Sequence, residues 1–144
     1  MVKLELSDTQ YRKLIELAYL GEWMVNAQHD TEFQDDAATA IVQKLLAAPG
    51  IAGVDRDEET HEFFMESAWT ERLFDEYILD YDDHTFWDEL TERLAQRDLA
   101  RERGSSPEDI NREDDLLELR PHEERYRREL EEHGLDRLEL GSGF

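Results

Sequence analysis

Acidic side chains limit what this chain can fold into more than any other feature of its sequence. The chain carries 38 Asp and Glu residues against 16 Lys and Arg residues, a formal net charge of -22. Repulsion at that level weakens a compact state in dilute buffer, and concentrated salt relieves it, because the Debye length falls to about 3 Å at 1 M. We therefore expect a salt-adapted protein of a halophilic bacterial cytoplasm, whose stability rises with salt.

Composition also bears on the class of protein. The chain has no Cys, which removes disulfides and thiolate sites. No segment approaches the roughly 18 apolar residues that cross a bilayer, and residues 1–6 alternate charged and apolar side chains, unlike a secretory signal. Clusters of Lys and Arg that would bind nucleic-acid phosphates are missing. We expect a cytoplasmic protein that binds neither membrane nor nucleic acid and needs no cofactor.

The acidity has an alternative explanation, in which the chain imitates nucleic acid and attracts a basic partner. Acidic residues occur along almost every segment and do not form one stripe, which favours adaptation to salt. Arg125, Arg127 and Arg128 form a short basic run, but glutamates surround it. Intrahelical ion pairs are the expected use of these arginines.

The pattern of apolar residues predicts an all-α fold, a bundle of five to six helices. Ser7, with Gln10 three residues later, matches a capping box and predicts a first helix from Asp8 to about Gln28. Asp82–Thr85 is predicted to break the chain between two later helices. The remaining helices are predicted over residues 33–47, 58–80, 85–103 and 121–133, with a further start signal at 106–109.

The two ends of the chain carry the β-like patterns. Residues 2–6 alternate, and residues 135–140 are short and apolar, so a two-stranded ribbon joining the termini is one prediction and a solvated tail is the alternative. For the domain organisation we expect a helical core domain over residues 1–104. A charged helical extension over residues 105–144 is expected to pack on that same domain.

One face of the first predicted helix is a candidate partner-binding surface. Glu16, Tyr19, Trp23 and Asn26 share a stripe that mixes two aromatic rings with polar groups. Such aromatics are enriched in protein interfaces, so we predict that this face binds a protein partner or a second copy of the chain. The alternative is that both rings pack inside the domain. Gly21 is expected to let a neighbouring helix approach closely.

Acidic pairs raise the possibility of metal-dependent chemistry. Glu59 with Glu62, and Glu89 with Glu92, have the spacing with which helical nucleotide pyrophosphohydrolases hold Mg²⁺. In a sequence this acidic such pairs arise by chance, and the downstream Glu-x-x-Asp partner is absent. A metal-dependent phosphohydrolase is therefore the alternative function.

Asp83, His84 and Asp88 form the densest group of candidate metal ligands, of a type suited to Mn²⁺, Fe²⁺ or Zn²⁺. The alternative is a turn with capping aspartates and a solvated histidine, and we expect no bound metal. Nucleophile elbows, phosphate-binding loops and zinc-protease helices are all missing, so no catalytic residue is predicted. The sequence favours a non-enzymatic interaction or regulatory module.

Residues 19–27, which read YLGEWMVNA, and the preceding residues 14–17 carry a resemblance. This segment resembles one in a family of small bacterial proteins of unknown function that begin with a strand and a capped helix. The resemblance covers the first third of the chain. It implies a similar start to the fold, and it implies no activity, substrate or catalytic residue.

Overall fold

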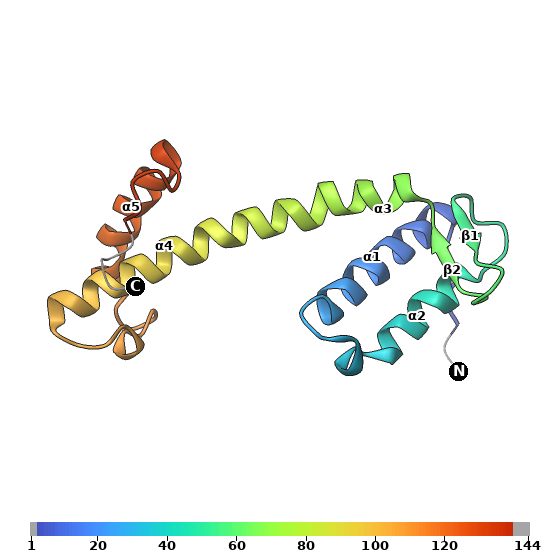
Figure 1. The fold of residues 1–144 in the computed structure, drawn as a ribbon, viewed down its shortest axis with the longest axis horizontal. Helices are drawn as coiled ribbons and strands as arrows, with labels where there is room; N and C mark the ends of the chain where they lie inside the picture. The colour runs from blue at the N-terminus through green and yellow to red at the C-terminus, as the bar shows by residue number, and fades with distance from the viewer. Residues whose placement is uncertain (1–2, 140–144) are drawn as a thin grey trace. The chain divides into compact units, whose positions relative to one another are not determined.

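The computed structural model describes residues 3–139, which are mainly helical with a small two-stranded antiparallel sheet (Figure 1). The mainly helical class predicted from the sequence is thereby confirmed. None of the helices in this part of the chain combines the length and the apolar composition that a membrane span requires. The elements are α1 (Asp8–Asn26), α2 (Asp36–Leu46), β1 (Val54–Arg56), β2 (Phe63–Met65), α3 (Ser67–Leu73), α4 (Leu79–Arg103) and α5 (Leu116–His133).

The number of separate helices differs from the prediction. The π-helical segment Phe74–Ile78 joins α3 to α4, so helical residues run without a break from Ser67 to Arg103. Residues 3–139 therefore hold four separate helices, namely α1, α2, the joined α3–α4 segment and α5, in place of five or six. The remaining helical turns are the short 3-10 segments Thr31–Phe33 and Pro107–Asp109.

The chain divides into two compact units, residues 1–80 and 81–144. Residue 104, where the composition suggests a boundary, lies inside the second unit. Each unit has a core of its own. The buried core of the first unit consists of Ile15, Val42, Leu46, Met65, Trp69 and Leu73. That of the second unit consists of Ala95, Leu99, Ala100, Ile110 and Leu119.

Local capping signals position the first two helices. Ser7 Oγ accepts a hydrogen bond from the backbone N–H of Gln10 at 3.3 Å, and Gln10 Oε1 accepts one from the N–H of Ser7 at 3.0 Å. The predicted capping box is therefore present at the start of α1. Asp35 caps α2 with its side chain alone, because its Oδ1 accepts from the N–H of Ala37 at 2.9 Å.

The helix predicted from residue 58 onward is wrong over its first nine residues. A β-hairpin occupies this region, with β1 antiparallel to β2 and Asp55 opposite Phe64. Helical structure begins only at Ser67. The aromatic spacing that suggested a helix starts at Phe63, which lies in β2.

Two side chains explain why this region forms a hairpin. Asp57 shapes the turn, because its Oδ1 accepts from the backbone N–H groups of Glu59 at 2.9 Å and Thr60 at 2.7 Å. Gln43 of α2 holds the second strand, since its amide bonds both the N–H and the carbonyl oxygen of Phe63 at 2.8 Å. The hairpin thus depends on a contact with α2.

Three further predictions are wrong. Helix α4 continues through Asp82–Thr85, where a break is predicted. Helix α5 begins at Leu116 and contains Pro121, which is predicted to start a separate helix. The predicted terminal strands are also missing, because residues 3–7 and 135–139 form neither strand nor ladder. Val2 and Leu140 of that prediction lie outside the described residues.

Candidate functional site

The predicted partner-binding face of α1 turns out to be largely internal. Glu16 is only 4% exposed and Asn26 only 6%. Tyr19 and Trp23 are half-buried, and Tyr19 packs against the core of the first unit. Of these four residues, a partner could reach only the two aromatic rings.

The prediction that Gly21 lets a neighbouring helix approach closely is wrong. Among the described residues, no atom lies within 4 Å of a Cβ placed on Gly21, apart from its own helix and its chain neighbours.

The buried side chain of Glu16 links α1 to α3. Trp69 Nε1 donates a hydrogen bond to its Oε1 at 3.0 Å, and Lys13 and Arg72 both form ion pairs with the carboxylate. The guanidinium of Arg12 covers the Trp69 ring, 3.6 Å from its centroid. Burial raises the pKa of Glu16, but the hydrogen bonds from Lys13 and Trp69 outweigh it, so the pKa lies below its ordinary value.

Asn26 holds the connection between α1 and α2. Its Oδ1 accepts from the backbone N–H of Asp35 at 2.7 Å, and its Nδ2 donates to Glu22 Oε1 at 3.0 Å. Because Glu22 also accepts from Thr39 Oγ1 at 3.0 Å, three segments meet at this point. The polar members of the predicted face therefore stabilise the first unit.

The candidate metal ligands lie within α4, and the structure brings only two of them together. His84 Nε2 lies 3.3 Å from Asp88 Oδ2, one helical turn away. Asp83 Oδ1 instead accepts a hydrogen bond from Trp87 Nε1 at 3.1 Å. Residues 3–139 contain no group of three or more His, Asp or Glu side chains placed to hold a metal ion.

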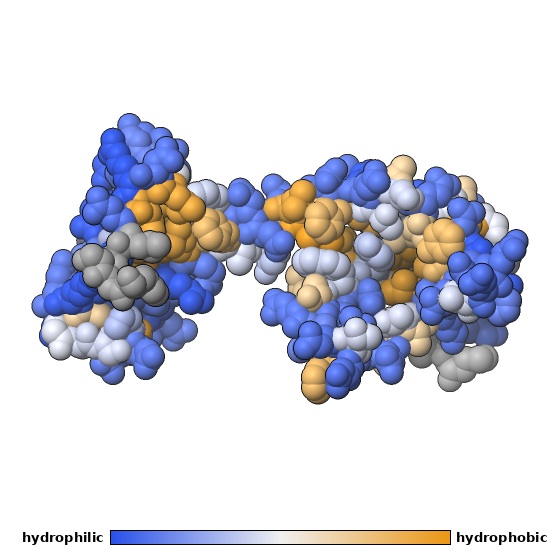
Figure 2. Space-filling model, in the orientation of Figure 1, coloured by the Kyte–Doolittle hydropathy of each residue, from blue (hydrophilic) through white to orange (hydrophobic). Residues whose placement is uncertain are grey.

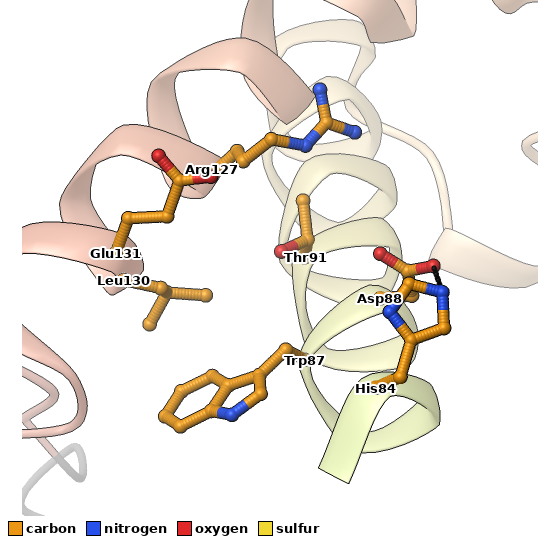
Figure 3. Close-up of a pocket in the computed structure, with 7 residues that line it drawn as sticks. All are labelled: His84, Trp87, Asp88, Thr91, Arg127, Leu130 and Glu131. Atoms are coloured by element: carbon orange, nitrogen blue, oxygen red, sulfur yellow. Dashed lines mark ion pairs between the residues drawn. The ribbon is translucent and has the colours of Figure 1, made fainter. Parts of the chain in front are cut away.

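A groove with a volume of about 510 Å³ lies between α4 and α5 in the second unit (Figure 3). Trp87 of α4 and Leu130 of α5 project into the space between the two helices and form an apolar floor. Charged side chains stand on either side of this floor. The full lining consists of His84, Trp87, Asp88 and Thr91 from α4 and Arg127, Leu130 and Glu131 from α5.

The groove exists because α4 and α5 diverge (Figure 1). They are joined near Asp98, whose carboxylate accepts a hydrogen bond from Arg125 Nη2 at 2.6 Å and another from the Tyr126 hydroxyl. Burial raises the pKa of Asp98, but hydrogen bonds from Tyr126 and Arg97 outweigh it, so the pKa is lowered. Away from this junction the helices separate and leave the Trp87 side chain half-exposed.

The arginines of α5 do not form the predicted intrahelical ion pairs. Arg125 pairs instead with Asp98 of α4. Within residues 3–139, Arg127 and Arg128 pair with no carboxylate, although Glu131 lies one helical turn from Arg127. Arg127 extends from α5 toward α4 along the edge of the groove (Figure 3).

Apolar side chains gather on the surface over α4 and α5 of the second unit, with hydrophilic side chains around them (Figure 2). Leu135 and Leu138, just beyond α5, are 49% and 39% exposed. The sequence pattern did not single out the pair of Trp87 and Leu130. Each residue alone looks like an ordinary apolar position of a helix, and only the crossing of α4 and α5 brings them together.

Comparison with protein-family models, with curated protein sequences and with solved structures gives no match for this chain. The resemblance of residues 19–27 to a bacterial family therefore remains a hypothesis. A proposal about the function of this chain therefore has to be argued from the geometry of the α4–α5 groove.

Proposed function

We propose that this chain is a non-enzymatic interaction protein that binds another protein through the groove between α4 and α5. The observation that carries the proposal is the apolar floor of Trp87 and Leu130 inside a charged rim. Protein interfaces share this anatomy, with an aromatic-containing apolar centre that excludes water and a polar rim around it. Tryptophan is also among the residues that contribute most to binding when a partner covers them.

The shape of the groove favours a helical segment as the bound element. Its two walls are helices, and its charged rim residues His84, Asp88, Arg127 and Glu131 are exposed to water. An amphipathic helix laid along such a groove covers the apolar floor with one face and reaches the rim with its polar edges. Covering a half-exposed tryptophan stabilises a complex by about 2 kcal/mol.

A photo-crosslinking side chain introduced in place of Asp88, which lines the groove, tests this proposal in the full chain. Irradiation in native cell extract is expected to join the chain to a second polypeptide. The same side chain in place of Arg120, an exposed residue of α5 outside the groove, is the control and is expected to give no adduct.

The substitution Trp87→Ala in the chain that carries the crosslinker at position 88 is expected to abolish the adduct, because it removes the apolar floor. Circular dichroism of this variant checks that its helices remain. Absence of any two-chain adduct from position 88, or an adduct that persists unchanged with Trp87→Ala, would contradict binding through the groove.

A further inference from the structure

We infer that the first unit binds a small zwitterion, an α-amino acid with an apolar side chain, in a hollow between the start of α1 and the turn after α2. Arg12 receives the carboxylate of this ligand, and Asp8 receives its ammonium group. Residues of the first unit alone line the hollow, so the site is separate from the α4–α5 groove and does not depend on the proposed function.

The hollow has a volume of about 440 Å³. The start of α1 and the end of α2 lie at the same end of the first unit (Figure 1). Tyr11 joins them, because its hydroxyl donates a hydrogen bond to the carbonyl oxygen of Leu45 at 2.9 Å. Leu6, Pro49 and Ile51 contribute apolar side chains to the wall. Small-molecule sites have this combination of volume, apolar wall and few charged groups.

Arg12 is held in position without a carboxylate partner. Its guanidinium lies 3.6 Å from the centroid of the Trp69 ring, and its Nη1 donates to the carbonyl oxygen of Ala52 at 3.0 Å. Trp69 is itself buried and bonded to Glu16, so the surface beneath the guanidinium is fixed. Within residues 3–139 the guanidinium forms this one hydrogen bond and no ion pair. Most of its N–H donors therefore remain for a ligand carboxylate.

Asp8 supplies the opposite charge. It precedes Arg12 by one turn of α1, so the two side chains lie on the same face of the helix, and both line the hollow. The other residues of the lining carry no charge. Among the described residues, Asp8 and Arg12 form no ion pair with each other. A ligand that carries both charges can therefore pair with both side chains.

The net charge of -22 decides between a charged ligand and a zwitterion. The field of such a chain repels an anion, and a cation would be attracted equally to the many other carboxylates of the surface. A zwitterion has no net charge, so Asp8 and Arg12 orient it without that repulsion. In an α-amino acid both charges lie beside the same carbon atom, which suits two side chains one helical turn apart.

Titration of the full chain with L-phenylalanine, followed by calorimetry and by the NMR shifts of backbone amides, tests this inference. We expect a Kd of about 0.1 to 1 mM, with shifts concentrated at the start of α1 and in residues 48–52. Three analogues each lack one group: phenylalaninamide lacks the carboxylate, phenylpropionate lacks the ammonium group, and L-serine lacks the apolar side chain. Each is expected to bind about tenfold more weakly or worse.

Two variants assign the charges to their residues. R12Q is expected to weaken binding of L-phenylalanine about tenfold without weakening binding of phenylalaninamide, which has no carboxylate to lose. D8N is expected to weaken binding of L-phenylalanine without weakening binding of phenylpropionate, which has no ammonium group. A variant that failed to fold would weaken every ligand alike, so this pattern separates a lost contact from a damaged fold.

R56Q is the matched control and is expected to bind L-phenylalanine like the wild type. Arg56 also lies over an aromatic ring, 5.5 Å from the centroid of Phe63, and its Nε also donates to a backbone carbonyl oxygen, that of His61. It lines no part of the hollow.

A wild type whose amides do not shift in about 10 mM L-phenylalanine would overturn the inference. Binding of phenylpropionate as tightly as L-phenylalanine, or an R12Q variant that binds L-phenylalanine like the wild type, would also overturn it. Each of these outcomes leaves the groove in the second unit untouched, since the crosslink from position 88 tests that site separately.

Discussion

The two units of this chain are held together by different means. In the first unit the buried carboxylate of Glu16 joins α1 to Trp69, beside a core that includes the fully buried Leu73. In the second unit the contact of α4 with α5 depends on Asp98 and Arg125, with only a small apolar cluster beneath. The same acidic composition thus supports one well-packed unit and one with an open apolar groove. That difference is the reason why the proposed binding site is placed in the second unit.

The energetics of the two units should differ accordingly. Truncation of a buried leucine costs the apolar contacts and leaves a cavity, whatever the salt concentration. Ion pairs on exposed side chains contribute little, because water and salt screen them. The first unit is therefore expected to be most sensitive to truncation of its apolar core, and the second to loss of the hydrogen bonds to Asp98, whose side chain is 18% exposed.

The largest effect is expected from Leu73→Ala in the first unit. Leu73 is completely buried, so its truncation is expected to lower the free energy of unfolding of this unit by about 3 kcal/mol. The second unit should be unaffected, because its core shares no residue with that of the first. Hydrogen exchange followed residue by residue in urea measures both units in one sample.

Leu117→Ala serves as the control for this experiment, since Leu117 is 82% exposed and its truncation should change neither unit. If Leu73→Ala lowered the stability of both units equally, the two would unfold as one cooperative body, and the contrast between them would fail.

A smaller effect is expected from Asp98→Asn in the second unit. The carboxylate accepts hydrogen bonds from Arg125 and Tyr126, and weakening them is expected to lower the free energy of unfolding of this unit by about 2 kcal/mol at neutral pH. Urea unfolding at pH 7 measures the loss. The first unit should keep its stability.

The pH dependence of the same variant has a defined sign. Because the folded pKa of Asp98 is lowered, its stabilising contribution is complete above the unfolded pKa and is lost as the pH falls through the folded one. The wild-type second unit should therefore lose this contribution below about pH 4, and the Asp98→Asn curve should be flatter there. The comparison covers about pH 2 to pH 5, where carboxyl groups ordinarily titrate. If the free energy of unfolding changed with pH equally in the two proteins, the partners of Asp98 would not stabilise its carboxylate.

Glu16→Gln is expected to cost about 1 to 2 kcal/mol, and only in the first unit. The amide keeps an acceptor for Trp69 Nε1 but leaves Lys13 and Arg72 without their carboxylate. Thermal unfolding monitored by hydrogen exchange measures the change. Glu71→Gln makes the same charge change at an exposed position of α3 and should have little effect.

The smallest effect, and the only favourable one, is expected from Gly21→Ala. Alanine is the better helix former by about 0.5 to 1 kcal/mol, and no atom within 4 Å outside its own helix and chain neighbours opposes the added methyl group. Gly53→Ala should do the opposite, because Gly53 has a φ of +84° and its Cβ would lie 3.2 Å from Glu66 Oε1. Urea unfolding measures both variants, and a loss of stability in Gly21→Ala would contradict the open space around Gly21.

Predictions that depend on neighbouring residues were right at several helix ends, but wrong for the break at Asp82–Thr85 and for the helix start at Pro121. The capping box of Ser7 and Gln10 starts α1, and the glycines Gly104 and Gly134 follow the last residues of α4 and α5, as their positions suggest. The candidate site could not be found in this way. Trp87 and Leu130 come from different helices, and no periodicity in the sequence connects them.

The sequence by itself determined the strong negative charge, the mainly helical class and several helix ends, because these depend on composition and on hydrogen bonds between residues three or four apart. Only the tertiary structure decided that Gln43 holds Phe63 in a strand, that Glu16 is buried, and that Trp87 and Leu130 face one groove. Each of these outcomes joins residues far apart in the chain, and such contacts outweigh the weak local preference of a short segment for helix or strand.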